Sequence, residues 1–117
     1  MALSIKPYIE NKERIHLIGI GGVSMNSLGE LLLSRGVPIS GSDRLRTDVT
    51  ARLEALGAKI TYEHKPENVE GASLIVRTAA VHDDNPEIVR AHELGIPVME
   101  RAEAWGHLMR DYDNVVC

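Results

Sequence analysis

Several residue types on which whole protein classes depend are scarce in this chain. It has one Cys, no Phe and only 3% aromatic residues. One Cys excludes an internal disulfide and a metal site built from several thiolates, and it favours a reducing compartment, which we take to be the cytoplasm. Apolar residues still make up 44% of the chain, so the core must consist of Val, Ile, Leu and Ala, as is typical of parallel strands covered by helices.

The sequence also lacks a basic excess and a long apolar segment. Its 13 Lys and Arg against 17 Asp and Glu give a net charge of −4, which argues against a nucleic-acid-binding protein. The longest stretch without these charged residues, 15–29, contains four glycines, so we expect no membrane span and no membrane partner. The first residues do not form the apolar segment of a secretory leader. At 117 residues the chain fits one domain of ordinary size.

Short apolar runs alternate along the chain with segments of helical periodicity. We predict strands at 15–19, 37–41, 58–62, 74–76 and 96–99, and helices at 23–34, 48–56, 66–69, 86–94 and 102–109. This alternation predicts an α/β fold that is Rossmann-like and doubly wound, with a five-stranded, mainly parallel sheet and helices on both faces. Lys59 places the third strand near an edge of the sheet.

Two further expectations concern the second helix and the domain boundaries. Thr47 or Asp48 would cap the helix at 48–56, with Val49, Leu53 and Leu56 on its buried face. We divide the chain into a lead-in at 1–14, a Rossmann-like domain at 15–112 and the start of a following domain at 113–117, where the sequence predicts the start of another strand.

A glycine-rich turn joins the first strand to the first helix. Gly19, Gly21 and Gly22 would leave backbone N–H groups free at a helix N-terminus, where the helix dipole favours a phosphate. The alternative is a tight turn that binds nothing. Ser24 stands where a dinucleotide-binding fingerprint has its third glycine, and its hydroxyl could donate to a phosphate or cap the helix. We expect Gly21→Val to keep the fold and block the phosphate.

Asp43 ends the second strand about twenty residues after the glycine turn, which is the spacing of a carboxylate that contacts a ribose. Its alternative role is that of a turn residue or helix cap. Arg44, next to it, could flank a nucleotide or remain a solvated surface residue.

Polar residues also follow the later strands. His64, Thr78 and Ala79 come after the third and fourth strands, at the edge of a parallel sheet where ligands bind. For His64 the alternative is an exposed loop histidine. Arg101 follows the fifth strand and could reach a phosphate or a base carbonyl.

We find no catalytic group and no metal site in the sequence. The five His residues have no metal-ligand spacing, and neither an acyl-transfer Gly-x-Ser-x-Gly motif nor an ATP-binding Gly-x-x-x-x-Gly-Lys-Ser/Thr loop is present. The segment 82–84 fits a polar turn before the Asn85 helix cap better than a catalytic cluster.

Five segments in this order resemble the N-terminal domain of the Mur ligase family. They are Ile15–Met25, Ser40–Asp43, Thr78–Val81, Asp84–Glu87 and Ile96–Glu103. The resemblance implies a domain that holds the UDP of UDP-N-acetylmuramate, with the pyrophosphate on the glycine turn and the helix start. It implies ribose and uracil contacts elsewhere. The site residues would be Gly19, Gly21, Gly22, Val23, Ser24, Met25, Asp43, Arg44, His64, Thr78, Ala79 and Arg101.

The sequence departs from the family at two places. The family usually has Gly at the position of Ser24, and often Ser-Ser at 78–79, so Ala79 would contribute only through its backbone. The family's ATP loop would follow a strand like 115–117, so we expect a substrate-binding part that binds and does not ligate, with no cofactor of its own. The full enzyme would use ATP and Mg²⁺ to activate the muramoyl carboxylate for attack by L-alanine.

Other functions remain open from the residues alone. A nicotinamide- or flavin-binding Rossmann domain of an oxidoreductase or a regulatory module would suit Asp43, but Ser24 counts against it. A third alternative is an interaction domain without enzymatic function. Within the family, the alanine-adding ligase is not separated from the relative that attaches a recycled peptide, although the pair Gly21-Gly22 favours the former.

Overall fold

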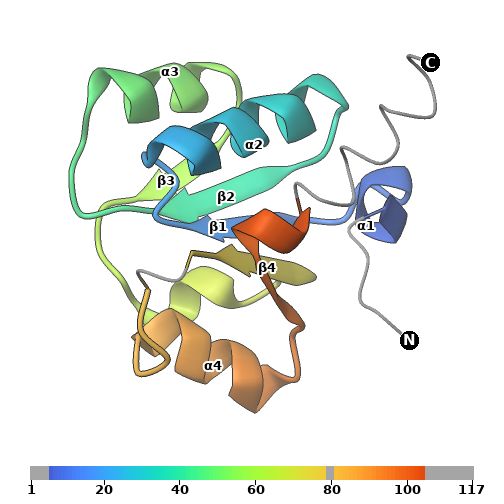
Figure 1. Ribbon diagram of the computed structural model, residues 1–117, viewed down its shortest axis with the longest axis vertical. Helices are drawn as coiled ribbons and strands as arrows, with labels where there is room; N and C mark the ends of the chain where they lie inside the picture. The colour runs from blue at the N-terminus through green and yellow to red at the C-terminus, as the bar shows by residue number, and fades with distance from the viewer. Residues whose placement is uncertain (1–5, 79–80, 105–117) are drawn as a thin grey trace.

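The computed structural model describes residues 6–78 and 81–104 (Figure 1). Its elements are α1 (Lys6–Glu10), β1 (Ile15–Ile18), α2 (Val23–Ser34), β2 (Ile39–Ser42), α3 (Asp48–Ala55), β3 (Lys59–Thr61), the 3₁₀ helix η1 (Pro66–Val69), β4 (Leu74–Arg77), α4 (Pro86–Leu94) and β5 (Val98–Glu100). Residues 101–104 are helical. The strand expected near 115–117, the rest of the helix expected at 102–109 and Ala79 lie outside the described residues.

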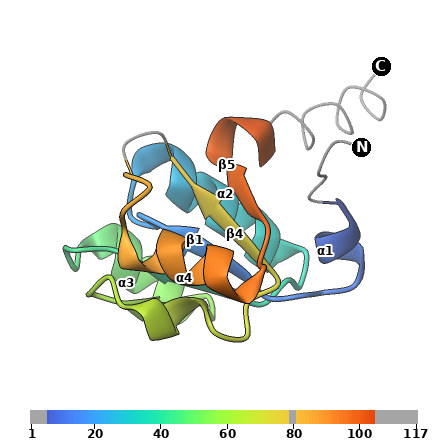
Figure 2. The same cartoon turned by 90° about the horizontal axis from the view of Figure 1, so that it is seen from below.

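The strands form one sheet in the order β3-β2-β1-β4-β5, and all neighbouring strands are parallel. Helices α2 and α3 cover one face, and η1 and α4 cover the other (Figure 1). Figure 2, turned by 90°, shows α4 in front of β1 and β4. The predicted α/β, doubly wound fold is therefore confirmed, and so is the edge position of β3. The strand order reverses between β1 and β4, which is where such sheets bind ligands.

Alternation along the strands sends different residues to the two faces. In β1, Ile15 and Leu17 join the large apolar cluster under α2, whereas Ile18 joins a smaller cluster with Ile75 and Ile88 under α4. Gly41 in β2 leaves room for the side chain of Ile20, in the turn after β1, because a Cβ at Gly41 would lie 2.6 Å from Ile20 Cδ1. Both faces of the sheet are thus covered, as the aliphatic composition predicts.

Several predicted strand and helix boundaries shift by one or two residues, and two of the strand starts shift past a proline. β2 begins at Ile39 because Pro38 has no N–H to donate, although the Pro38 carbonyl still accepts a hydrogen bond from Ile15 N (3.1 Å). β5 begins at Val98 instead of residue 96, again after a proline, Pro97.

The buried face of α3 differs from the prediction. Thr47 caps the helix, and a reciprocal bond from Thr47 N to Thr50 Oγ1 completes a capping box. The buried residues are Thr50 and Leu53, whereas Val49 and Leu56 are 38% and 53% exposed. The rotation of α3 about its axis places Thr50 against the glycine turn, a contact between distant segments that periodicity alone does not reveal.

Candidate functional site

The glycine turn is held by its own hydrogen bonds and by the end of β2. Gly19, at φ +77°, and Ile20 both donate to the Ser42 carbonyl, at 2.8 and 3.1 Å. Gly22 N donates to the Gly19 carbonyl at 3.0 Å. Gly21 N donates to Asp43 Oδ2 at 2.8 Å. The amides of Gly21 and Gly22 are therefore occupied within the turn.

Helix α2 starts directly after this turn without a side-chain cap. Its N-cap is Gly22, which has no side chain to cap the first N–H groups. The donors at this helix end are thus the first-turn amides of Val23, Ser24 and Met25. The Met25 side chain is only 1% exposed and belongs to the apolar core, so Met25 can serve a ligand only through its backbone. A phosphate at this turn stays a prediction, and the amides of 23–25 are its candidate donors.

Asp43 organises the turn that follows β2. Besides the bond from Gly21, its Oδ1 accepts from Arg44 N at 2.7 Å and Leu45 N at 3.3 Å. The alternative role of a turn residue is therefore present in the structure, and a ribose contact stays a prediction. A Cβ at Gly21 would lie 2.7 Å from Asp43 Oδ2 and 3.1 Å from Thr50 Cγ2. Gly21→Val would consequently displace the Asp43 side chain. A loss of ligand binding in this variant would therefore not be due to a blocked phosphate alone, as the sequence led us to expect.

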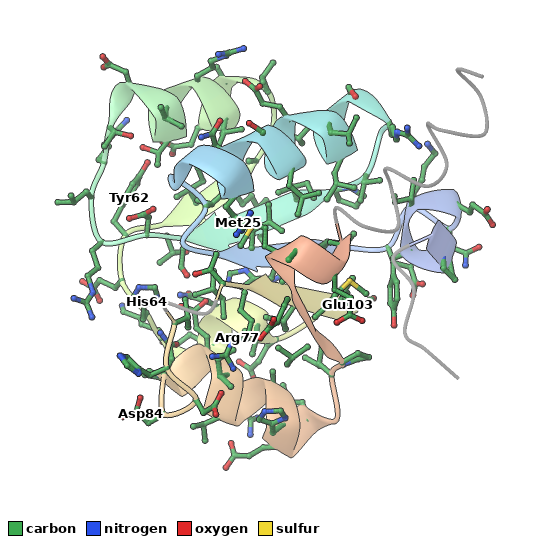
Figure 3. All side chains as sticks on the ribbon, viewed as in Figure 1. Met25, Tyr62, His64, Arg77, Asp84 and Glu103 are labelled. Atoms are coloured by element: carbon green, nitrogen blue, oxygen red, sulfur yellow. The ribbon has the colours of Figure 1, made fainter. Side chains whose placement is uncertain are left out.

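A cavity of about 480 Å³ opens beside this region. Its lining comes from the ends of β2 and β3 and from the segment between β4 and α4, and consists of Arg44, His64, Val81, His82, Asp84, Asn85 and Pro86. Figure 3 shows His64 and Asp84 on the same side of the molecule. The segment 82–84 was predicted as a polar turn, and residues 83–84 do form a turn in the structure. His82 and Asp84 of this segment also line the cavity.

Arg77, at the end of β4, fixes the segment that borders the cavity. Its guanidinium donates to the Val81 carbonyl and forms an ion pair with Asp83. The hydrogen bond and the positive charge of Arg77 lower the pKa of Asp83. The Nε of Arg77 is buried and has no hydrogen-bond partner among the described residues. Arg77 therefore acts as an anchor for this loop, a role that the sequence did not suggest.

A buried carboxylate, Glu87, lies behind His64. It is 0% exposed and sits in the first turn of α4. Its Oε1 accepts from His16 Nε2, and its Oε2 accepts from Ser42 Oγ (2.7 Å) and His64 Nδ1 (2.6 Å). Burial raises the pKa of Glu87, but the hydrogen bonds from His16, Ser42 and His64 and the charge of His16 lower it below its ordinary value overall.

The network continues across β1 and β2 to the opposite end of the sheet. Ser40 Oγ hydrogen-bonds His16 Nδ1 at 2.9 Å and accepts from Arg14 Nε at 3.1 Å. Arg14 also donates to the Asn68 carbonyl at 2.9 Å. Sequence reasoning missed the inner members His16 and Ser40, as it missed Ser42 and Glu87. The available signal for His16, Ser40 and Ser42 was their occurrence in buried strands, since buried polar groups need partners.

The remaining predicted residues lie apart from this network. Thr78 follows β4 and is partly buried, and Arg101 begins the helical residues 101–104 and is also partly buried. Neither lines the cavity described above. Arg44 is exposed and lines it.

Residues 6–78 and 81–104 contain no group of three His, Cys, Asp or Glu residues placed to bind a metal. No helix among them is long and apolar enough to cross a membrane.

The matching family model and several similar proteins and structures are named as ligases. The model of the Mur ligase family, catalytic domain, matches residues 14–113. The UDP-N-acetylmuramate–L-alanine ligase of Alkaliphilus metalliredigens (strain QYMF) is 48% identical over 104 residues, which are 89% of this chain and 23% of that protein. The crystal structure of the UDP-N-acetylmuramate–alanine ligase MurC of Thermotoga maritima matches with a TM-score of 0.76 and 37% identity, covering 87% of this chain and 23% of the other.

A further structural likeness shows the fold alone. The UDP-N-acetylmuramate:L-alanyl-γ-D-glutamyl-meso-diaminopimelate ligase of Neisseria meningitidis matches with a TM-score of 0.69 at 24% identity, over 76% of this chain and 28% of the other. This chain therefore spans less than a quarter of the alanine-adding relatives above and little more than a quarter of this ligase.

Proposed function

The chain belongs to the Mur ligase family, and we propose that it holds the UDP part of UDP-N-acetylmuramate in a ligase that adds L-alanine during peptidoglycan precursor synthesis. The observation that carries this proposal is the uncapped start of α2 at the point where the strand order reverses, together with the cavity that Arg44 lines next to Asp43. A nucleotide can span both features, with its diphosphate on the helix and its nucleoside in the cavity.

Each part of the ligand has a candidate group. The diphosphate would bind the amides of 23–25, where the helix dipole favours an anion. Arg44 follows the carboxyl end of β2, is exposed and lines the cavity, so it could supply a positive charge to the diphosphate. Asp43 and His64 would contact the ribose and the uracil. Thr78, Ala79 and Arg101 remain candidate contacts, as the family resemblance implies.

The activity of the whole enzyme is likewise a proposal. ATP and Mg²⁺ would activate the muramoyl carboxylate, and the amine of L-alanine would then form the amide bond. These partners would bind parts of the relatives that the present chain does not span. The chain by itself is proposed to bind the substrate and not to ligate. A cytoplasmic location also stays a prediction.

Two alternatives are less well supported. A dinucleotide-binding oxidoreductase domain fits the fold, but the relatives at 48% and 37% identity are named as ligases for UDP-N-acetylmuramate. The peptide-attaching ligase matches at 24% identity, below both values, which favours the alanine-adding function.

A titration of the ¹⁵N-labelled chain with UDP tests the proposal. We expect amide shifts in residues 19–25 and around Asp43 and His64, with much smaller shifts when NADH replaces UDP. Arg44→Ala should weaken UDP binding several-fold, since one cation is lost, whereas the matched variant Arg52→Ala on α3 should not. Absence of shifts at millimolar UDP, or stronger binding of NADH, contradicts the proposal.

A further inference from the structure

His64 reaches the cavity with only one of its two ring nitrogens. Its Nδ1 lies 2.6 Å from Glu87 Oε2 and 3.2 Å from Ser42 Oγ, inside the buried network. Its Nε2 has no hydrogen-bond partner among the described residues and is not counted among their buried unpaired atoms. The side chain is 18% exposed and lines the cavity. The two nitrogens of this ring therefore have separate roles.

We propose that Glu87 is a positioning residue that keeps the Nδ1–H tautomer of His64, so that Nε2 presents a lone pair to the cavity and accepts a hydrogen bond from the ligand. A neutral imidazole has one N–H and one acceptor nitrogen, and the partner of one nitrogen decides the state of the other. An ionised carboxylate only accepts, so His64 must donate to it through Nδ1. The ligand's identity rests on the proposed function, whereas the tautomer does not.

Glu87 is itself prevented from turning away. His16 Nε2 and Ser42 Oγ contact its oxygens, and its backbone N–H is capped by Asn85 Oδ1 at 2.9 Å. Its position in the first turn of α4 places the carboxylate at the positive end of the helix dipole. A buried charge with these partners has one stable orientation, because any rotation would leave polar groups unpaired.

The acceptor at Nε2 defines the chemistry of the group that it recognises. That group must carry a hydrogen to donate, as the imide N–H of uracil and the hydroxyls of ribose do. The ring nitrogen at the corresponding position of cytosine is an acceptor and would face Nε2 lone pair to lone pair. The geometry thus favours a uridine nucleotide over a cytidine nucleotide, if the base is the donor.

The tautomer can be measured directly in the unliganded chain. Two-bond ¹H–¹⁵N spectra of the histidine rings at about pH 8, where an ordinary histidine is neutral, distinguish a protonated from an unprotonated nitrogen. We expect His64 to be protonated at Nδ1 and to change towards the Nε2–H form in Glu87→Gln. The matched variant Glu93→Gln, at an exposed position of the same helix, should leave the His64 signals unchanged. An Nε2–H tautomer in the unmodified chain overturns the proposal even if Glu87→Gln does not fold.

Binding measurements identify the donor. With UDP, Glu87→Gln should weaken binding about tenfold and Glu93→Gln less than twofold, since one oriented hydrogen bond is lost. In the unmodified chain, a large loss with 3-methyl-UDP assigns the imide, and a large loss with 2′-deoxy-UDP or 3′-deoxy-UDP assigns the corresponding hydroxyl. If none of the three analogues loses affinity, the acceptor role of His64 is refuted. If UDP itself does not bind, the proposed function fails while the tautomer result still stands.

Discussion

The two faces of the sheet are built from the same three central strands but with different chemistry. Under α2 and α3, the side chains of Ile15, Leu17 and Ile39 pack in a continuous aliphatic cluster. Under α4, the intervening positions include His16 and Ser40, which lead to Glu87 through buried hydrogen bonds. Register explains the pairing, because His16 lies beside Ser40 in the parallel ladder.

The aliphatic face contributes mainly burial, whereas the polar face holds the hydrogen-bond network that reaches His64. An aliphatic cluster is stabilised by burial without demands on orientation. A buried polar network contributes little net stability, but it holds its members in one arrangement when every group is paired. His64 at the cavity is attached to the polar face, so the rigid part of that face supports the candidate site.

The largest effect should come from the apolar face. Leu17 is 0% exposed in the centre of the sheet, and Leu17→Ala should lower the free energy of unfolding by about 3–4 kcal/mol through lost burial and a cavity. Urea denaturation followed by circular dichroism measures this change. Leu56→Ala, at a residue that is 53% exposed, is the control and should cost less than about 1 kcal/mol. Equal losses would show that the core is not where the structure places it.

Glu87→Gln tests the polar face. The substitution keeps the shape but replaces a charged acceptor of three hydrogen bonds, so we expect a loss of about 2–3 kcal/mol. The same denaturation experiment applies, with Glu93→Gln as control. A loss above that of Leu17→Ala would reverse the assignment of stability to the apolar face.

Acid should affect the polar face selectively. The pKa of Glu87 is lower in the folded chain than its ordinary value of 4.5, so its stabilisation is complete above that value. When the pH falls below 4.5, Glu87 becomes protonated in the unfolded chain while it is still ionised in the folded chain. The stabilisation therefore decreases with falling pH, and it is fully lost once the pH is below the folded-state pKa. Stability measured across this acid range should fall less steeply in Glu87→Gln than in the unmodified chain. Parallel curves would contradict the lowered pKa.

Helix caps give a smaller, matched comparison. Thr47 Oγ1 accepts from Thr50 N at the start of α3, and Asn85 Oδ1 accepts from Glu87 N at the start of α4. Thr47→Ala and Asn85→Ala should each cost about 1 kcal/mol by denaturation. Only Asn85→Ala should also alter the His64 ring signals, because it loosens the turn that carries Glu87. An equal response of His64 to both variants would show that the faces are not independent.

The smallest effect is expected at the surface. Arg52 pairs with Glu30 at 2.8 Å between α3 and α2, with the Arg52 side chain 71% exposed. Arg52→Ala should therefore change the free energy of unfolding by less than about 0.5 kcal/mol. A loss above 1 kcal/mol in the same denaturation assay would mean that this pair contributes to docking of the two helices.

Much of the fold was predictable from local signals. The glycines after α2 and α4, at φ +79° and +73°, mark helix ends because left-handed backbone favours Gly, and Asn85-Pro86 marks a helix start. The buried face of α3 was not predictable, since Val49 and Thr50 occupy equally plausible helical positions. Only the packing of Thr50 against the glycine turn distinguishes them.

The candidate site was predicted in part. The glycine turn, Asp43, Arg44 and His64 do gather at one edge of the sheet, because parallel strands bring their carboxyl ends together. The role of Glu87 was hidden, because 71 residues separate it from His16 and nothing local marks it as buried. The buried side chain of Met25 restricts any ligand contact of this residue to its backbone, and that contact stays a prediction.

The sequence by itself determined the aliphatic α/β architecture, the order of the elements and the place of the glycine turn, because these follow from periodicity, breakers and caps within short segments. The tertiary structure decided that Asp43 accepts from the Gly21 amide and that Nδ1 of His64 contacts Glu87. Those outcomes depend on hydrogen bonds between segments far apart in the chain, whose partners are chosen only when the sheet is assembled. The scarcity of aromatic residues is consistent with this division, since the aliphatic core supplies packing and a few buried polar groups supply orientation.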